Sequence, residues 1–176
     1  MEKIGLIIGR FDPLHVGHEY LINYALSKCD KLLIFIGSAN KNLSLSNPFS
    51  YEEREMMLKS VFDNRIIVAP LNDIGVGNVP AWGNYIISSA LKYVSNIDYF
   101  FYGDEAKCNL WFDEKAKKNI QFVPLSREHI NIHGTNIREY LLNDDIDSFK
   151  KYTNQKLHYL YKDFRSRILD LYNKED

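Results

Sequence analysis

Five short apolar segments recur along the chain, and stretches of helical periodicity separate them. The segments are nearly continuous in Ile, Leu, Val, Phe and Tyr, and they fall at Ile4–Ile8, Lys31–Gly37, Arg65–Pro70, Ile97–Tyr102 and Ile120–Pro124. Strands that are apolar along their whole length are typical of a parallel sheet covered on both faces. The helical patterns between them fall at Val16–Ser27, Ser50–Val61, Val79–Tyr93 and within Asp104–Lys117. This alternation predicts an α/β fold, a doubly wound parallel sheet of about five strands with right-handed crossovers.

The pattern changes after the fifth apolar segment. Three helical stretches follow it: Asn136–Leu142, Asp144–Tyr152 and Lys156–Tyr172. A chain of 176 residues is the size of one well-packed domain. We therefore predict one domain over residues 1–176, with a sheet core over about 1–133 and a C-terminal helical part over about 134–176. Two helix starts carry local signals, because Ser50 and Glu53 have capping-box spacing and Pro80 suits a first helical turn.

The charge balance argues against some partners. The chain has 22 Lys and Arg against 23 Asp and Glu, and a pI near 6.5, so we predict binding to neither nucleic acid nor a membrane. No apolar run reaches membrane-spanning length and no leader precedes the first strand, which predicts a cytoplasmic protein. Cys29 and Cys108 lack metal-ligand spacing, and we expect buried thiols. Whether the chain forms a homo-oligomer is left open.

Unusual residues gather where the predicted strands end. Gly9–His18 follows the first strand; the segments after the other four are Gly37–Asn47, Leu71–Asn78, Gly103-Asp104 and Arg127–Arg138. In an open α/β sheet the ligand lies beyond the carboxyl ends of the strands, where the strand order reverses. These five segments are therefore the predicted functional loops.

The first of these loops reads Gly-Arg-Phe-Asp-Pro-Leu-His-Val-Gly-His from residue 9, and it joins a strand to a helix. A helix N-terminus offers unpaired N–H groups to an anion, and glycine at positions 9 and 17 permits close approach of phosphate. His15 and His18 are three residues apart, so both rings can reach one ligand. Arg10 adds a planar fork suited to phosphate oxygens. The alternative is a pair of structural histidines that cap the helix.

This loop resembles the Gly-x-Phe-Asp-Pro-x-His-x-Gly-His signature of the nucleotidylyltransferase superfamily with the HxGH motif. The resemblance implies a Rossmann-like fold and an enzyme that joins a nucleoside triphosphate to a phosphorylated acceptor with release of pyrophosphate. It also implies that His15 and His18 contact the triphosphate and stabilise the transition state, with Arg10 beside them. On the same ground we expect Gly9, Phe11 and Gly17 to contact ATP.

A second anion site is predicted near the C-terminal helices, in Gly134-Thr135-Asn136-Ile137-Arg138. A glycine and a hydroxyl at a helix start, with an arginine one turn later, suit phosphate, although an ordinary N-cap and a solvated arginine explain the same residues. The segment resembles the Ser/Thr-x-x-Arg motif of the same superfamily. The resemblance implies that Thr135 and Arg138 hold the β- and γ-phosphates beside Gly134, and that Arg138 takes part in catalysis. His133 stands where many relatives carry serine.

The middle loops resemble a narrower group. Gly37-Ser38-Ala39-Asn40 and Asn47-Pro48-Phe49-Ser50-Tyr51-Glu52-Glu53-Arg54 are similar to runs of the archaeal-type nicotinamide-mononucleotide adenylyltransferases. The segment from Asp73-Ile74 to Trp82 also fits that family. The resemblance implies that the mononucleotide is bound by Ser38, Asn40, Lys41, Asp73 and Trp82, and that Gly103 and Asp104 lie beside the adenosine. For Trp82, core packing and stacking on the pyridinium are equally consistent with the sequence.

One position departs from that pattern. Ser46 stands where the family usually has a basic residue before the Asn/Asp-Pro-Phe run, and we expect Lys41 of the same loop to substitute. Arg54 lies a full turn into a predicted helix, and we expect a structural ion pair there.

The predicted reaction transfers AMP from ATP to nicotinamide mononucleotide, giving NAD and pyrophosphate. The acceptor's phosphate is already ionised at neutral pH, so the reaction requires positioning and charge stabilisation and no strong general base. No carboxylate cluster resembles a metal cage, so we expect Mg²⁺ to arrive with ATP. Three alternatives stay open: nicotinate mononucleotide as the acceptor, phosphopantetheine as the acceptor, or a nucleotide-binding regulator with little turnover.

Overall fold

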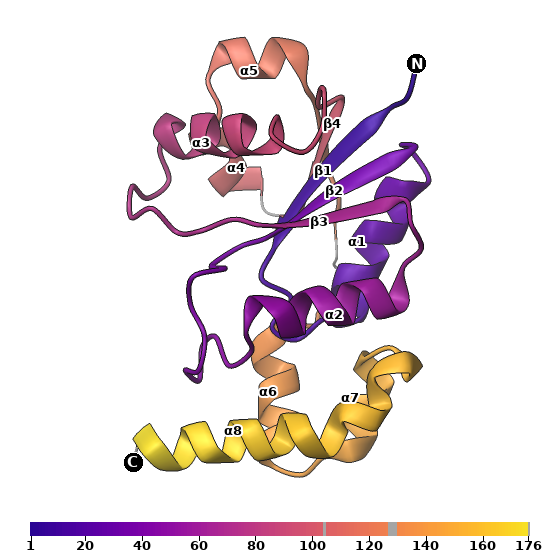
Figure 1. The fold of residues 1–176 in the computed structure, drawn as a ribbon, viewed down its shortest axis with the longest axis vertical. Coiled ribbons are helices and arrows are strands. Elements are labelled where there is room, and N and C mark those ends of the chain that lie inside the picture. The colour runs from indigo at the N-terminus through magenta and orange to yellow at the C-terminus, as the bar shows by residue number, and fades with distance from the viewer. Residues whose placement is uncertain (104, 127–129, 176) are drawn as a thin grey trace.

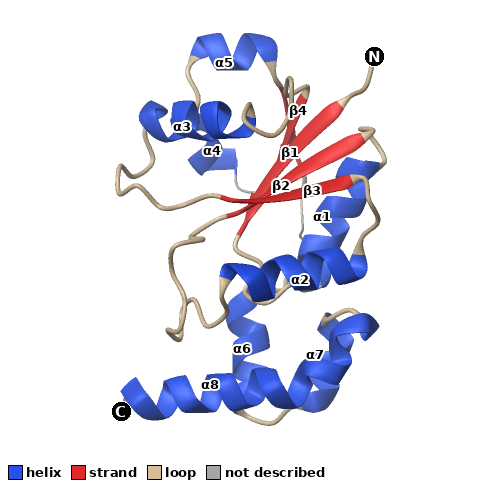
Figure 2. Cartoon of the chain, in the orientation of Figure 1, coloured by secondary structure: helices blue, strands red, loops and turns tan. Residues whose placement is uncertain are grey.

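The sheet has five strands, and all of them run parallel. The computed structural model describes residues 1–103, 105–126 and 130–175. The strands are β1 (Ile4–Gly9), β2 (Lys31–Ile36), β3 (Ile66–Pro70), β4 (Tyr99–Tyr102) and β5 (Gln121–Pro124). Their order is β3-β2-β1-β4-β5, so β1 is central and pairs with β2 on one side and β4 on the other (Figure 2). The predicted doubly wound α/β fold is confirmed.

Helices cover both faces of this sheet. They are α1 (Val16–Leu26), α2 (Tyr51–Val61), α3 (Pro80–Ala90), α4 (Glu105–Trp111) and α5 (Glu114–Asn119). Figure 1 shows α1 and α2 on one side of the strands and α3, α4 and α5 on the other. Side chains alternate between the two layers along each strand: Ile34 packs with α1 and α2, whereas the neighbouring Leu33 and Phe35 pack with α3 and α4. Both faces of the central strands are therefore apolar, as the continuous runs predicted.

Local signals place several of the helix starts. The Ser50 hydroxyl accepts the Glu53 N–H at 3.1 Å while the Glu53 carboxylate accepts the Ser50 N–H at 3.1 Å, which confirms the capping box. Pro80 occupies the first turn of α3, as expected. The helical pattern expected within Asp104–Lys117 corresponds to two helices, α4 and α5, because the Asp113 side chain accepts the Ala116 N–H at 2.9 Å and starts α5. Asp104 itself lies outside the described residues.

The C-terminal part is helical. It consists of α6 (Gly134–Leu142), α7 (Ile146–Tyr152), the 3₁₀ helix η1 (Gln155–Leu160) and α8 (Tyr161–Glu175). The prediction of one helix over Lys156–Tyr172 was wrong at its start, because the Asn154 side chain caps the Lys156 N–H at 2.9 Å and a 3₁₀ segment follows. Phe149 and Phe164 are buried in the cluster that also holds the α1 side chains.

Two polar links join these helices to the sheet layer. Arg167 of α8 donates to both carboxylate oxygens of Glu53, at 2.8 and 3.2 Å. The Asn154 amide donates to Glu19 on α1 at 2.7 Å. The starts of α1 and α2 are thereby tied to the C-terminal helices.

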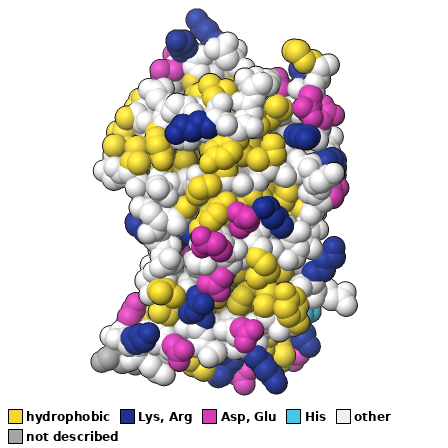
Figure 3. Space-filling model, in the orientation of Figure 1, with side chains coloured by type: hydrophobic (Ala, Val, Ile, Leu, Met, Phe, Trp, Pro, Cys, Tyr) yellow, Lys and Arg dark blue, Asp and Glu magenta, His cyan; other side chains and the backbone are white. Residues whose placement is uncertain are grey.

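The remaining general expectations concern thiols and the surface. The thiols of Cys29 and Cys108 are buried, as predicted. Acidic and basic side chains are interspersed on the face shown in Figure 3. Among the described residues, no helix combines the length and apolar character needed to cross a bilayer.

Candidate active site

The predicted loops meet at the point where the strand order reverses. β2 and β3 lie to one side of β1, and β4 and β5 lie to the other. The loops after β1 and β4 therefore diverge and leave a crevice at the carboxyl ends of these strands. Two adjoining cavities of about 620 Å³ and 280 Å³ open there, and both are lined by Phe11, His18 and His133.

The two histidines form the N-terminus of α1. His15 is the N-cap residue, and its Nδ1 accepts the Gly17 N–H at 3.1 Å, while the Nδ1 of His18 accepts the His15 N–H at 3.2 Å. The rings stack with 3.7 Å between centroids. Because each Nδ1 accepts a backbone N–H, each neutral ring carries its proton on Nε2. The histidines thus cap the helix, as the structural alternative proposed, and also line the smaller cavity.

Gly17 is required by this close arrangement. A Cβ at this position would lie 3.0 Å from the His15 ring, closer than side chains normally approach. A larger residue at position 17 would push the imidazole away from its cap position. The glycine of the motif therefore has a steric reason.

The smaller cavity combines both predicted anion sites. It is lined by Arg10, Phe11, Asp12, His15, His18, His133, Gly134, Thr135 and Arg138. Arg138 donates to the Asp12 carbonyl at 2.8 Å and to the Thr135 hydroxyl at 3.2 Å, so the start of α6 is held against the loop after β1. The cavity wall therefore carries two arginines, histidines and a helix N-terminus, which together suit a polyphosphate.

Asp12 in the wall of this cavity and the neighbouring Arg54 are both buried. Arg54 is fully buried, and it donates to the carbonyls of Ser50, Arg10, Gly37, Ser38 and Lys41 at 2.9 to 3.4 Å. Its guanidinium lies 3.9 Å from the Asp12 carboxylate, which confirms the expected ion pair. Burial raises the pKa of Asp12 to about 6, although Arg54 and the Phe49 N–H act in the opposite direction. One arginine thus joins the loops after β1 and β2 to the start of α2.

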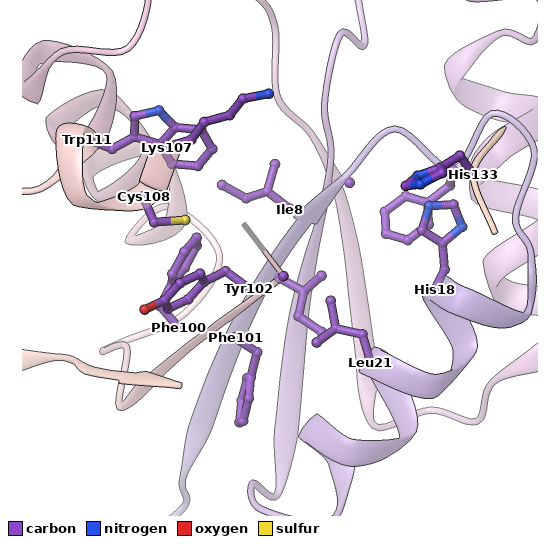
Figure 4. A pocket seen from close by; sticks show the side chains of 14 residues that line it. Ile8, His18, Leu21, Phe100, Phe101, Tyr102, Lys107, Cys108, Trp111 and His133 are labelled. Carbon is purple, nitrogen blue, oxygen red and sulfur yellow. The ribbon is translucent and has the colours of Figure 1, made fainter. Parts of the chain in front are cut away.

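The larger cavity is more apolar. Figure 4 shows His18 and His133 on one side of it and Trp111, Lys107 and Cys108 of α4 on the other. Ile8, Phe100, Tyr102 and Gly103 also line it, from the ends of β1 and β4. A flat ring fits such a mainly apolar space, while phosphates fit the adjoining polar one.

The loops after β2 and β3 form a polar cluster. Asp73 accepts from the Lys41 ammonium at 2.8 Å and from the Ser38 hydroxyl at 3.0 Å, and its N–H donates to Asn40 at 3.1 Å. Partial burial opposes ionisation, but the hydrogen bonds from Lys41 and Ser38 outweigh it and lower the pKa of Asp73. The four predicted polar residues of these loops are therefore in contact with one another. Ser46 is exposed and accepts from the neighbouring Asn47 amide.

Trp82 lies apart from both cavities. It stacks on Tyr85 with 5.6 Å between centroids and meets Trp111 edge-on at 6.4 Å. Trp111 lines the larger cavity, and Trp82 is not among its described lining residues.

Most of the predicted phosphate residues come together, and several functional candidates were missed. Gly9, Phe11 and Gly103 line the larger cavity, whereas Asp104 and residues 127–129 lie outside the described residues. Asp12, Lys107 and Trp111 were not singled out from the sequence. Asp12 lies inside the recognised motif, so its position was a usable signal. Among the described residues, no group of three or more His, Cys, Asp or Glu side chains is placed to hold a metal ion.

Comparison with known proteins agrees with this geometry. The chain matches the cytidylyltransferase-like family over residues 6–159, so it belongs to that family of nucleotidyltransferases, and the resemblance drawn from the motifs is confirmed. It is similar to curated nicotinamide-nucleotide adenylyltransferases. The protein of Thermococcus kodakarensis is 30% identical over 148 residues, which cover 81% of this chain and 74% of that one. The protein of Archaeoglobus fulgidus is 28% identical over 165 residues, covering 89% and 88%.

Solved structures share the fold. A bifunctional NMN adenylyltransferase/ADP ribose pyrophosphatase from Francisella tularensis superposes with a TM-score of 0.80 at 22% identity. The match covers 99% of this chain and 54% of that one, so the chain spans about half of the bifunctional protein. A second structure of that enzyme, complexed with AMP and a manganese ion, gives a TM-score of 0.78 at 24% identity, covering 97% of this chain and 52% of that one.

Proposed function

We propose that the protein is a nicotinamide-nucleotide adenylyltransferase, which transfers AMP from ATP to nicotinamide mononucleotide and releases pyrophosphate. One observation carries the proposal: the stacked pair His15 and His18 shares a cavity with Thr135 and Arg138 at the switch point of the sheet. The names of the similar archaeal proteins support the choice of acceptor.

The reaction is one displacement at phosphorus. An oxygen of the mononucleotide's phosphate attacks the α-phosphorus of ATP, the new P–O bond forms, and the bond to the β-phosphate oxygen breaks with its electron pair going to pyrophosphate. The attacking phosphate is ionised at neutral pH, so no proton has to be removed. The protein contributes orientation and stabilisation of the charge that develops on the phosphoryl oxygens.

The residues divide by their position in the two cavities. His15 and His18 donate from Nε2 to the phosphoryl oxygens, and Arg10 and Arg138 contribute fixed positive charge. Thr135 and the backbone of Gly134 meet the β- and γ-phosphates at the start of α6. Gly9, Phe11, Gly17 and Gly103 form the surface against which ATP lies.

The acceptor occupies the side of the site that faces the loops after β2 and β3. Ser38, Asn40, Lys41 and Asp73 form the polar cluster on this side, and Trp82 stands at the start of α3. Lys41 supplies the positive charge that the family usually has at the position of Ser46. Its ammonium is held by Asp73, so the mononucleotide meets an ion pair there and not an isolated cation.

Mg²⁺ belongs to the substrate in this proposal. It enters with the triphosphate and neutralises part of its charge, as in other phosphoryl transfers. The manganese ion in the related Francisella structure supports the use of a divalent metal.

The test is direct. Purified protein with ATP, Mg²⁺ and nicotinamide mononucleotide is expected to form NAD and pyrophosphate in equal amounts. Binding of both substrates without NAD formation would contradict the proposal, and tight NAD binding without pyrophosphate release would favour a regulator. Nicotinate mononucleotide and phosphopantetheine, assayed for pyrophosphate release under the same conditions, separate the acceptors.

His18→Ala tests the catalytic role. We expect kcat to fall by about a hundredfold or more while the Kd for ATP changes little, because loss of one preorganised donor costs mainly transition-state stabilisation. Equal losses in kcat and in ATP affinity would contradict that role.

A further inference from the structure

We propose that His133 contacts the β-phosphate of bound ATP and stabilises the charge that develops on pyrophosphate as it leaves. This inference rests on the proposed function and adds a catalytic residue on the side of the leaving group. Many relatives carry serine at this position, so the imidazole is a feature of this chain and not of the shared motif.

His133 lies at the boundary between the two cavities of the site. It lines both of them, together with Phe11 and His18. Figure 4 shows His133 and His18 on the same side of the larger cavity, across from α4. An ATP molecule whose nucleoside lies in the larger cavity and whose outer phosphates lie in the smaller one crosses this boundary. Its inner phosphates therefore pass beside His133.

Packing on both sides of His133 holds its backbone against the segment that carries the histidine motif. The preceding residue, Ile132, is buried, and its Cγ2 would lie 3.2 Å from a Cβ at Gly17. The following residue, Gly134, would place a Cβ 3.3 Å from the Asp12 carbonyl oxygen. Both contacts are close because a glycine leaves out its side chain. The residue between them is therefore held from both sides.

Hydrogen bonds fix the same stretch of backbone. The His133 N–H donates to the Asn136 side-chain oxygen at 2.9 Å, and the His133 carbonyl accepts the Asn136 N–H at 3.0 Å. These bonds place His133 at the N-cap of α6, where it is exposed. A donor whose backbone is fixed before the substrate arrives requires little reorganisation when charge develops beside it.

The helix that His133 begins decides which phosphate it meets. His15 and His18 belong to the start of α1, on the side of the α-phosphate. His133 directly precedes Gly134 and Thr135, which meet the β- and γ-phosphates in the proposed complex. The β-phosphate is the one nearest to the cavity boundary on the α6 side, so we assign the His133 contact to it.

The contact acts on the leaving group during the displacement. The bond between the α-phosphorus and the bridging oxygen breaks, its electron pair stays on that oxygen, and no proton has to be transferred. A hydrogen bond from an imidazole N–H to a β-phosphate oxygen strengthens as this charge grows, so it favours the transition state over bound ATP. The same hydrogen bond favours binding of free pyrophosphate.

Calorimetric titration with pyrophosphate and Mg²⁺ measures the contact without turnover. His133→Ser is expected to raise the Kd for pyrophosphate about tenfold, because a hydrogen bond to a charged group is lost. His133→Asn keeps an N–H donor and is expected to recover part of this affinity. His158→Ser is the matched control, since His158 lies in η1 and is not among the described residues that line either cavity. An unchanged Kd in His133→Ser, or an equal loss in the control, would overturn the proposal.

Kinetics in both directions supply the second measurement. His133→Ser is expected to lower the forward kcat about tenfold with little change in the KM for nicotinamide mononucleotide. In the reverse reaction, which forms ATP from NAD and pyrophosphate, the KM for pyrophosphate is expected to rise while the KM for NAD stays the same. A rise confined to the KM for nicotinamide mononucleotide would overturn the assignment, and so would a lower thermal midpoint with parallel losses in every kinetic constant.

This proposal and the proposed function fail in different ways. If the wild type forms no NAD while His133→Ser still weakens pyrophosphate binding, the proposed function fails and the phosphate contact stands. If NAD forms and His133→Ser keeps the wild-type kcat and the wild-type Kd for pyrophosphate, the function stands and the contact fails. Absence of pyrophosphate binding to the wild type also overturns the contact.

Discussion

Replacement of Arg54 should lower the stability of the fold, because Arg54 holds together the loops that form the site and does not line either cavity. Arg54→Met keeps the length of an apolar side chain but removes a guanidinium that is fully buried and bonded to five backbone carbonyls. It also leaves the Asp12 carboxylate without the cation 3.9 Å away.

The size of the effect follows from these losses. Removing one partner of a buried ion pair typically costs 3–5 kcal/mol, because the other charge stays buried and unpaired, and buried carbonyls lose their donor as well. We expect the free energy of unfolding to fall by about 4 kcal/mol. With a urea m-value of about 2 kcal/mol/M, the denaturation midpoint moves down by about 2 M.

Equilibrium urea denaturation of Arg54→Met and the wild type measures this shift. Arg65→Met is the matched control, because Arg65 forms an exposed ion pair with Asp63 and its loss should hardly move the midpoint. A shift for Arg54→Met no larger than that of the control would refute the reasoning. Arg54→Met combined with Asp12→Asn should lose less than the two single changes together, since the pair then no longer leaves a lone charge.

Three further outcomes follow from the geometry. Burial raises the pKa of Asp12 from 3.8 to about 6, so the folded chain binds this proton more tightly than the unfolded chain does, and the free energy of unfolding falls as the pH rises through that interval. In the wild type we expect this fall to reach up to about 3 kcal/mol between pH 4 and 6. Asp12→Asn should lose this pH dependence when its free energy of unfolding is measured beside that of the wild type. Gly83→Ala should lower the thermal midpoint and cost about 2 kcal/mol, since the overlap with the Trp111 carbonyl exceeds the helix-propensity gain, and an unchanged midpoint would contradict it. Arg138→Lys should lower kcat/KM for ATP about tenfold without loss of folded protein by circular dichroism, because an ammonium cannot span both of the arginine's contacts.

The strands were predictable because burial of both faces of a sheet requires apolar residues at every position along a strand. A strand such as β2 reads as an unbroken apolar run, and its bounds were predicted to within one residue. The histidine pair was equally accessible, since spacing along one helix turn places both rings together.

The contacts that organise the site were harder to predict. An ion pair was predicted for Arg54, but its partner Asp12 lies 42 positions away in the sequence, and nothing in the local pattern pointed to that partner or to the surrounding backbone carbonyls. Trp111 was not singled out, because only a helical pattern within Asp104–Lys117 was predicted for the segment after β4. Asp113 is a typical N-cap residue, so the sequence did carry a local signal that a second helix begins there.

The proposed phosphate site is assembled from two segments that lie far apart in the chain. Arg138 bonds to the Asp12 carbonyl across a separation of 126 residues, and β1 reaches its neighbour β4 only after some 90 residues. A ribosome delivers residues in order at about 5–20 per second, so the histidines emerge many seconds before their arginine partner. Until then the nascent chain holds only part of the proposed phosphate site, so we expect that nucleotide cannot act as a template for its folding. Affinity for ATP should therefore arise in one step, when α6 leaves the exit tunnel, and stalled chains that end before and after this helix would differ sharply in nucleotide retention.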